Sequence, residues 1–172
     1  MAHGSTAHDD RLQRFEISLS NQQSAHAVDE WQLFAAVRSV LEDSQFTSAA
    51  ISLAVVDDAT IHALNRQYLN HDYATDVLSF VLDESDGHLE GEVIFSADTA
   101  AAAASSEAHW SVAAEQLLYV IHGTLHLTGY DDKSPADAQE MRTAERKHLR
   151  QFGLDLPGAL ATGVGLREAG SP

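Results

Sequence analysis

One segment of the chain, from Ser111 to Gly129, has the pattern of a helix with two clearly marked ends. Ser111 is a favourable N-cap residue, and Gly129 stands where a residue with left-handed backbone commonly ends a helix. Leu117, Ile121 and Leu125 recur every four residues, so they form an apolar row on one face. Such a row is stable only when another layer covers it, and we therefore expect a packed core around this helix.

Short strands and further helices are predicted on both sides of this helix. Alternating or continuous apolar residues indicate strands, and Asp or Ser before an apolar pattern of period three to four indicates helices. Strands are expected at about 14–19, 49–56, 77–82 and 91–95, with a turn at 84–87, and further helices at about 30–41, 58–68, 97–107 and 135–152. These elements predict one α+β domain over residues 13–156, between a mobile N-terminal segment (1–12) and a mobile C-terminal tail (157–172).

The chain is strongly acidic, with 26 Asp and Glu against 10 Lys and Arg in 172 residues and a formal net charge of −16. The stretch between Arg66 and Lys133 holds no Lys or Arg at all. A nucleic-acid backbone attracts cations, so this charge argues against nonspecific binding to DNA or RNA. The absence of cysteine excludes disulfides and thiolate metal sites. No apolar run reaches the roughly 18 residues of a membrane span, and no secretory signal is recognisable, so we expect a soluble, cytoplasmic protein.

His122 and His126 lie four residues apart on the predicted helix, which places both rings on one face. After the terminal glycine the chain turns, and Asp131 or Asp132 can bring a carboxylate back to the same point. Two imidazoles and one carboxylate suit a divalent transition metal and leave a coordination position open. Residue 123 is Gly rather than the Glu of the HExxH metalloprotease motif, which argues against a peptidase. From spacing alone, a zinc hydrolase and a non-haem iron oxygenase are both permitted.

The chain contains the blocks HGTLHLTGYDD at 122–132 and TDVLSF at 75–80. These two blocks resemble the YbeY family, which comprises bacterial metal-dependent endoribonucleases implicated in ribosomal RNA maturation. The first, HGTLHLTGYDD at 122–132, matches the family signature HGxLHLxGYDH at every position except the last. The second, TDVLSF at 75–80, is present intact, and GEVI at 91–94 is similar to a further family strand, with Glu92 in place of Asp. The resemblance extends over about residues 15–154.

The resemblance implies a zincin-like α+β fold, in which a small mixed sheet of about four strands is packed with about five helices. It also implies one zinc ion held by His122, His126 and Asp132, with a zinc-bound water for hydrolysis. The implied activity is that of a single-strand-specific endoribonuclease acting in ribosomal RNA maturation and ribosome quality control. Its partners would be single-stranded rRNA and the ribosome or small-subunit proteins, with no membrane and no DNA expected.

Two departures from the family pattern bear on this function. Asp132 stands where the family has a third His ligand; its oxygen can bind zinc at a comparable distance, but it makes bound water less acidic and favours harder metals. Asp131 is the alternative ligand. Leu69 stands where the family has Arg after Tyr68, and a guanidinium there would hold a phosphate or stabilise charge in the transition state. An alternative function is therefore a ribosome-assembly binding factor with weak or lost nuclease activity.

Other polar residues are candidates for the substrate side of the site. Arg66, three residues before Leu69, can reach the groove from the same helix, and it can equally be a surface charge. Thr75, Asp76 and Ser79 can line the cleft beside the metal, and a turn cap and strand positions explain them equally well.

The last predicted helix carries positive charge at regular spacing. Its arginines are four residues apart, which predicts a short basic stripe: Arg142, Arg146 and Arg150. The stripe either pairs with acids such as Glu145 or contacts RNA phosphates or a ribosomal protein. His71 and His148 are interpreted as ordinary surface residues.

Overall fold

The computed structural model describes residues 14–73 and 75–158. The predicted mobile segment 1–12, and all but the first two residues of the predicted tail 157–172, lie outside the described residues. Helices and strands occupy the regions expected from the sequence, with bounds that differ by a few residues. None of the helices in the described ranges is both long and apolar enough to cross a membrane.

Four strands form one mixed sheet in the order β1-β2-β4-β3. The strands β1 (Phe15–Asn21), β2 (Ser48–Val56) and β4 (His88–Ser96) are parallel, and β3 (Val77–Ser85) runs antiparallel to β4. β3 and β4 form the predicted hairpin, and its turn contains two residues at positive φ, as tight hairpin turns require. β3 therefore lies at one edge of the sheet.

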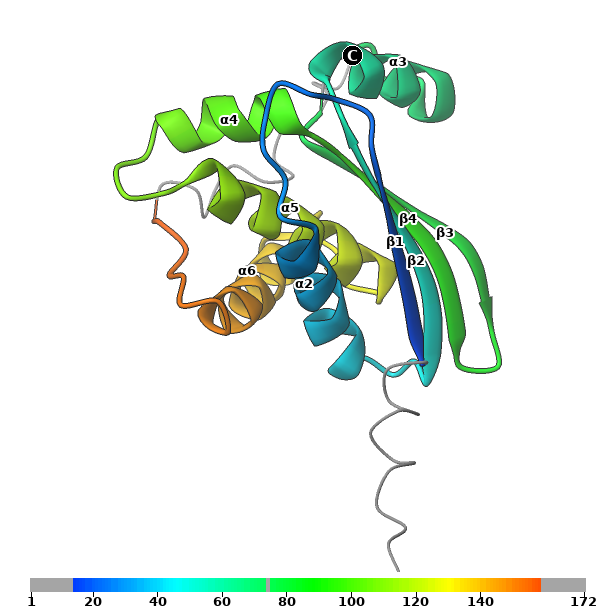
Figure 1. Cartoon of the computed structure of the whole chain (residues 1–172). Coiled ribbons are helices and arrows are strands. Elements are labelled where there is room, and N and C mark those ends of the chain that lie inside the picture. The colour runs from blue at the N-terminus through cyan, green and yellow to red at the C-terminus, as the bar shows by residue number, and fades with distance from the viewer. Residues whose placement is uncertain (1–13, 74, 159–172) are drawn as a thin grey trace, which may run out of the picture.

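Five helices pack around this sheet in the described part of the chain: α2 (Glu30–Glu42), α3 (Asp58–Leu69), α4 (Ala97–Ser105), α5 (Val112–Leu127) and α6 (Pro135–Arg150). Each begins after an Asp or Ser whose side chain accepts a hydrogen bond from a backbone N–H of the first turn. α2, α4, α5 and α6 cover one face of the sheet, and α3 lies on the opposite face near one end (Figure 1). The predicted α+β fold, with about four strands and five helices, is confirmed.

α5 occupies the centre of the helix layer, where it contacts α2, α4 and α6 as well as the strands β3 and β4. Thirteen of its sixteen residues are buried. The sequence predicted only one apolar row on this helix, so it underestimated the burial of α5. The sides of α5 that do not face the sheet are covered by α2, α4 and α6. Polar residues of α5 such as Glu115 and His122 are consequently held in the interior, where each needs a partner.

α5 approaches the sheet closely at Gly123. A Cβ atom added there would lie 2.6 Å from Val93 Cγ1, 3.0 Å from Ser79 Oγ and 3.2 Å from Val77 Cγ2. The two valines cannot easily move aside, because they are branched at Cβ and packed in the sheet. Gly123 is thus the residue that lets the helix with both histidines lie directly against β3 and β4.

We expect Gly123→Ala to lower the free energy of unfolding by about 1–3 kcal/mol, the range typical of an overpacked core. The loss should appear even though Ala is intrinsically the better helix former by about 1 kcal/mol. Urea denaturation of variant and wild type measures the difference. Gly158→Ala is the control, because a Cβ there meets no atom within 4 Å. Equal stability of Gly123→Ala and wild type would contradict the close packing.

Candidate metal centre

Two histidines lie on consecutive turns of α5. The Nε2 atoms of His122 and His126 are 3.0 Å apart, and the ring centroids are 4.5 Å apart. His122 is only 2% exposed, whereas the ring of His126 is partly open to solvent. Two ring nitrogens this close need a proton or a cation between them, because two facing lone pairs would repel. The four-residue spacing therefore brings both rings to one point, as the sequence indicated.

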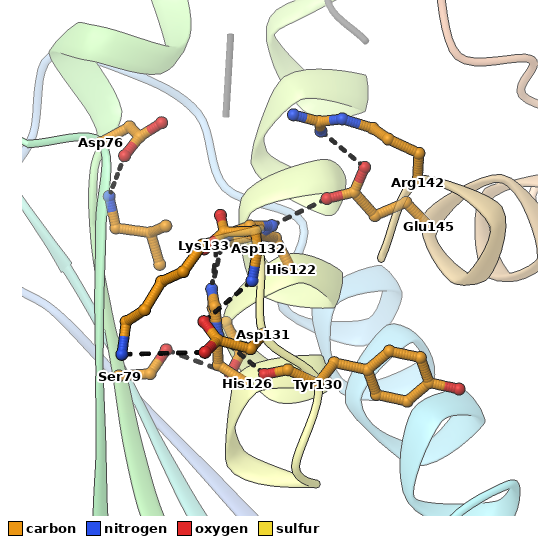
Figure 2. Close-up of polar contacts among 12 residues, drawn as sticks. Asp76, Ser79, His122, His126, Tyr130, Asp131, Asp132, Lys133, Arg142 and Glu145 are labelled. Atoms are coloured by element: carbon orange, nitrogen blue, oxygen red, sulfur yellow. Dashed lines mark hydrogen bonds and ion pairs between the residues drawn. The ribbon is translucent and has the colours of Figure 1, made fainter. Parts of the chain in front are cut away.

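The turn after α5 returns a carboxylate to the two rings (Figure 2). Gly129, at a φ of +104°, lies in the left-handed region predicted for it, and the backbone then leads through Tyr130 to Asp132. Asp132 Oδ2 lies 3.7 Å from His122 Nε2 and 3.8 Å from His126 Nε2, too far for hydrogen bonds. The three side chains each offer one ligand atom within 4.8 Å of the others.

The carboxylate of Asp132 has an unpaired oxygen. Across residues 14–73 and 75–158, Asp132 Oδ2 is the one buried side-chain nitrogen or oxygen without a hydrogen-bond partner. Such an atom is costly to bury, and a cation between the three side chains would compensate it. Two imidazole nitrogens and one carboxylate oxygen suit a divalent transition metal, so His122, His126 and Asp132 could hold such an ion.

The second nitrogen of each ring faces an acceptor. His126 Nδ1 lies 3.0 Å from the backbone carbonyl of Tyr130, and His122 Nδ1 lies 2.7 Å from Glu145 Oε1. A carbonyl oxygen can only accept, so His126 Nδ1 donates its proton there. With Nδ1 engaged in both rings, the two Nε2 atoms are the ones available to a metal.

Charges around the site shift the pKa of two of its groups. Burial lowers the pKa of His126, but the Asp132 carboxylate and the Tyr130 carbonyl outweigh burial and raise the pKa above its ordinary value. Burial raises the pKa of Asp132, but the two imidazoles and Arg142 outweigh burial, so that the net pKa is lowered. Asp132 is therefore a carboxylate at neutral pH, as a metal ligand must be.

Asp131, the alternative ligand considered from the sequence, is engaged elsewhere. Its Oδ2 lies 3.7 Å from the ammonium of Lys133, and its Oδ1 accepts a hydrogen bond from the backbone N–H of Asp132 at 2.8 Å. The geometry therefore favours Asp132 as the third donor of the group.

Ser79 is brought against the helix that carries the histidines, where its hydroxyl donates to the carbonyl of Gly123 at 3.0 Å. Thr75 and Asp76 shape the start of β3: the Thr75 hydroxyl and the backbone N–H of Val77 both donate to Asp76 Oδ1. Arg66 is exposed on α3. Arg66 makes no hydrogen bond or ion pair with the three donor residues in the described ranges. The structure thus places Ser79 beside the site.

Two charged residues of α6 adjoin the site and were not predicted as part of it. Glu145 is 0% exposed, and its Oε2 accepts from Arg142 Nη1 at 2.7 Å while its Oε1 faces His122. The predicted pairing of the arginines with acids such as Glu145 is confirmed at Arg142. Arg142 is 8% exposed, because the buried carboxylate draws its guanidinium inward, so it does not belong to an exposed basic stripe; Arg146 and Arg150 are exposed. The sequence signal that could have indicated this pair is an acid and a base three residues apart, Glu145 and Arg142, beside apolar positions.

His148 was also misplaced by the sequence interpretation. It is buried rather than exposed, and its Nδ1 lies 2.5 Å from Ser39 Oγ. The reason is that α2 packs on α6 and covers this position. His71 is exposed, as expected.

The fold and the site together define a class: a small α+β protein whose mixed sheet supports a central helix with a His-His-Asp group able to hold a metal ion. A sequence model of the family described as Endoribonuclease YbeY matches residues 18–153. The chain belongs to the YbeY family, and the resemblance inferred from its motifs is confirmed.

Several curated relatives are described as Endoribonuclease YbeY. The protein from Geobacter sulfurreducens is 36% identical over 152 residues, which cover 84% of this chain and 99% of the relative. That from Moorella thermoacetica is 36% identical over 155 residues, covering 81% of this chain and 98% of the relative. The protein from Rhodopirellula baltica is 44% identical over 109 residues, which cover 63% of this chain and 56% of the relative. The chain thus spans little more than half of some relatives and nearly all of others.

The fold is also similar to a solved one. The solution structure of a Thermotoga maritima protein superposes with a TM-score of 0.56 at 22% sequence identity, over 90% of this chain and 99% of that protein. The similarity supports the α+β fold.

Proposed function

We propose that this chain is a zinc-dependent, single-strand-specific endoribonuclease that acts in ribosomal RNA maturation and ribosome quality control in the cytoplasm. The family to which it belongs supports the endoribonuclease activity. The observation that carries the metal site is the unpaired, buried Oδ2 of Asp132, 3.7 and 3.8 Å from two ring nitrogens. His122, His126 and Asp132 are the proposed ligands, and three protein ligands leave a position open for chemistry.

A zinc ion held by these residues would supply a Lewis acid and would lower the pKa of water, which is the chemistry that hydrolysis of a phosphodiester needs. The protein contributes the orientation of the ligands: the Tyr130 carbonyl holds the ring of His126, and α5 holds both histidines in register. Asp132 adds a negative charge that a third histidine would lack. We therefore expect a less acidic water than a three-histidine site gives, and more tolerance of harder divalent metals.

The substrate is proposed to lie along the edge strand β3. Ser79 joins this edge to α5 beside the histidines, and Thr75 and Asp76 lie where the strand begins. Arg66, exposed on α3, is the candidate phosphate contact from that helix. Because the net charge is −16, free RNA should bind weakly and with strong salt dependence, and a ribosomal partner would supply the remaining affinity.

Cleavage of an end-labelled single-stranded RNA tests this activity. We expect internal cuts in the single strand, little cleavage of the same RNA annealed to its complement, and none of the corresponding DNA. His126→Ala protein purified in the same way controls for a contaminating nuclease, because it lacks one proposed ligand. Equal cleavage of single strand and duplex, or trimming from the ends alone, would contradict a single-strand-specific endonuclease.

A second candidate function, a ribosome-assembly factor with weak or lost nuclease activity, is favoured by one observation. Leu69 is an apolar residue, 44% exposed at the end of α3, where the family has Arg. Such a protein would keep the metal for folding or docking, so it would bind zinc and leave RNA intact.

A non-haem iron enzyme would instead be recognised by iron as the metal bound after purification without added metal.

A further inference from the structure

We propose that Glu145 is a positioning residue that sets the tautomer and orientation of His122 for metal binding. The inference deepens the proposed function and rests on it, because it concerns the same metal site. Its starting point is a difference between the two histidines. His126 is held by a backbone carbonyl of the adjoining turn, whereas His122 is held by a side chain from another helix.

Glu145 is enclosed on all sides, and both of its oxygens have a partner. Oε1 lies 2.7 Å from His122 Nδ1, and Oε2 lies 2.7 Å from Arg142 Nη1. A buried carboxylate is tolerated when it is paired and hydrogen-bonded. Arg142, three residues earlier on the same helix face, supplies the opposite charge. The arrangement leaves Oε1 directed at His122 (Figure 2).

The direction of the hydrogen bond decides which ring nitrogen can bind a metal. A carboxylate accepts and does not donate, so the proton of His122 lies on Nδ1 and its Nε2 is left with a free lone pair. That Nε2 is the atom facing Asp132 and the Nε2 of His126. Carboxylates that hold a ligating histidine in this way fix the ring and make it a better ligand, and their loss typically weakens metal binding about 10- to 100-fold.

One stretch of chain supplies both Asp132 and the carboxylate behind His122. Asp132 lies just before Ser134, whose hydroxyl caps α6 by accepting from the backbone N–H of Asp137. Glu145 follows on the buried face of the same helix, which packs on α5. Docking of this stretch on α5 therefore brings the third donor and the positioning carboxylate to the histidines together.

Glu145→Gln tests the inference, because it keeps the size of the side chain but leaves one oxygen to serve both Arg142 and His122. We expect the dissociation constant for Zn²⁺, measured by competition with a chromogenic chelator, to rise about 10- to 100-fold. Glu140→Gln makes the same charge change at an exposed position of α6 and should leave that constant unchanged. A Glu145→Gln protein that binds zinc as tightly as wild type would overturn the inference.

Nitrogen-15 NMR of His122 in the metal-free wild type is a second readout. A purely structural role of Glu145 would not determine which ring nitrogen of His122 carries the proton. We expect a protonated Nδ1 and an unprotonated Nε2. A proton on Nε2 instead would overturn the inference, even if Glu145→Gln failed to fold. Failure of the proposed function can be distinguished from failure of this inference. A wild type that binds no zinc, or that binds zinc without cleaving RNA, contradicts the function. The NMR result still decides the role of Glu145 in that case.

Discussion

We expect Asp132→Ala to lose the bound zinc and the RNA cleavage that depends on it, whereas Asp131→Ala keeps both. Without the Asp132 carboxylate only the two histidines remain, one ligand short of the three that catalytic zinc sites use. The loss of affinity should exceed about 100-fold, the upper range for replacing a group that merely supports a ligand. Elemental analysis after dialysis of the purified proteins measures the metal per chain.

Asp131→Ala is the matched control for this experiment. It removes the same charge one residue away, from a side chain that pairs with Lys133. Asp132→His introduces the residue of the family signature and should keep the ion, because imidazole is an equally good zinc ligand. Metal content of Asp132→Ala equal to that of wild type would contradict the assignment. Loss of metal in Asp131→Ala alone would transfer the role to Asp131.

Leu69→Arg is expected to raise the rate of single-stranded RNA cleavage by about 100-fold. A positively charged donor near a reacting phosphate stabilises charge that develops in the transition state, and such a donor is typically worth about 10²–10³ in rate. Leu69 is already partly exposed at the end of α3, so the longer side chain can be accommodated without disturbing the core. Initial rates on a labelled RNA, at equal zinc occupancy, measure the change.

Gln67→Arg separates a specific effect from a general one. Gln67 is exposed on the same helix, and the substitution adds the same charge to a strongly acidic protein. If both variants accelerate cleavage equally, the gain comes from better RNA binding in general. If neither does, and the wild type is inactive with zinc bound, the chain is a binding factor rather than a nuclease.

Features that depend on neighbouring residues could be predicted from the sequence. Asp29, Ser111 and Ser134 cap helices where expected, because a capping side chain bonds to a backbone N–H within three residues of it. The meeting of His122 and His126 likewise follows from the geometry of a single helix, since 3.6 residues per turn places residues four apart on one face.

Features that join distant segments could not be predicted in the same way. Glu145 reaches His122 across 23 positions, and His148 reaches Ser39 across 109. An acid and a base three residues apart on α6 fit an exposed ion pair as well as a buried one, and the packing of α2 and α5 against α6 decides between the two. The burial of Arg142 was not predicted for this reason, and the burial of α5 on all sides was underestimated for the same reason.

The rate of RNA cleavage as a function of metal occupancy tests most directly whether an ion held by His122, His126 and Asp132 carries the activity. Wild-type protein is stripped with a chelator, reloaded with increasing amounts of zinc, and assayed on a labelled single-stranded RNA while the bound metal is quantified. We predict no cleavage by the stripped protein and a rate that rises in proportion to occupancy until one ion is bound per chain. Cleavage by fully stripped protein, or intact RNA at full occupancy, would contradict a metal-dependent endoribonuclease.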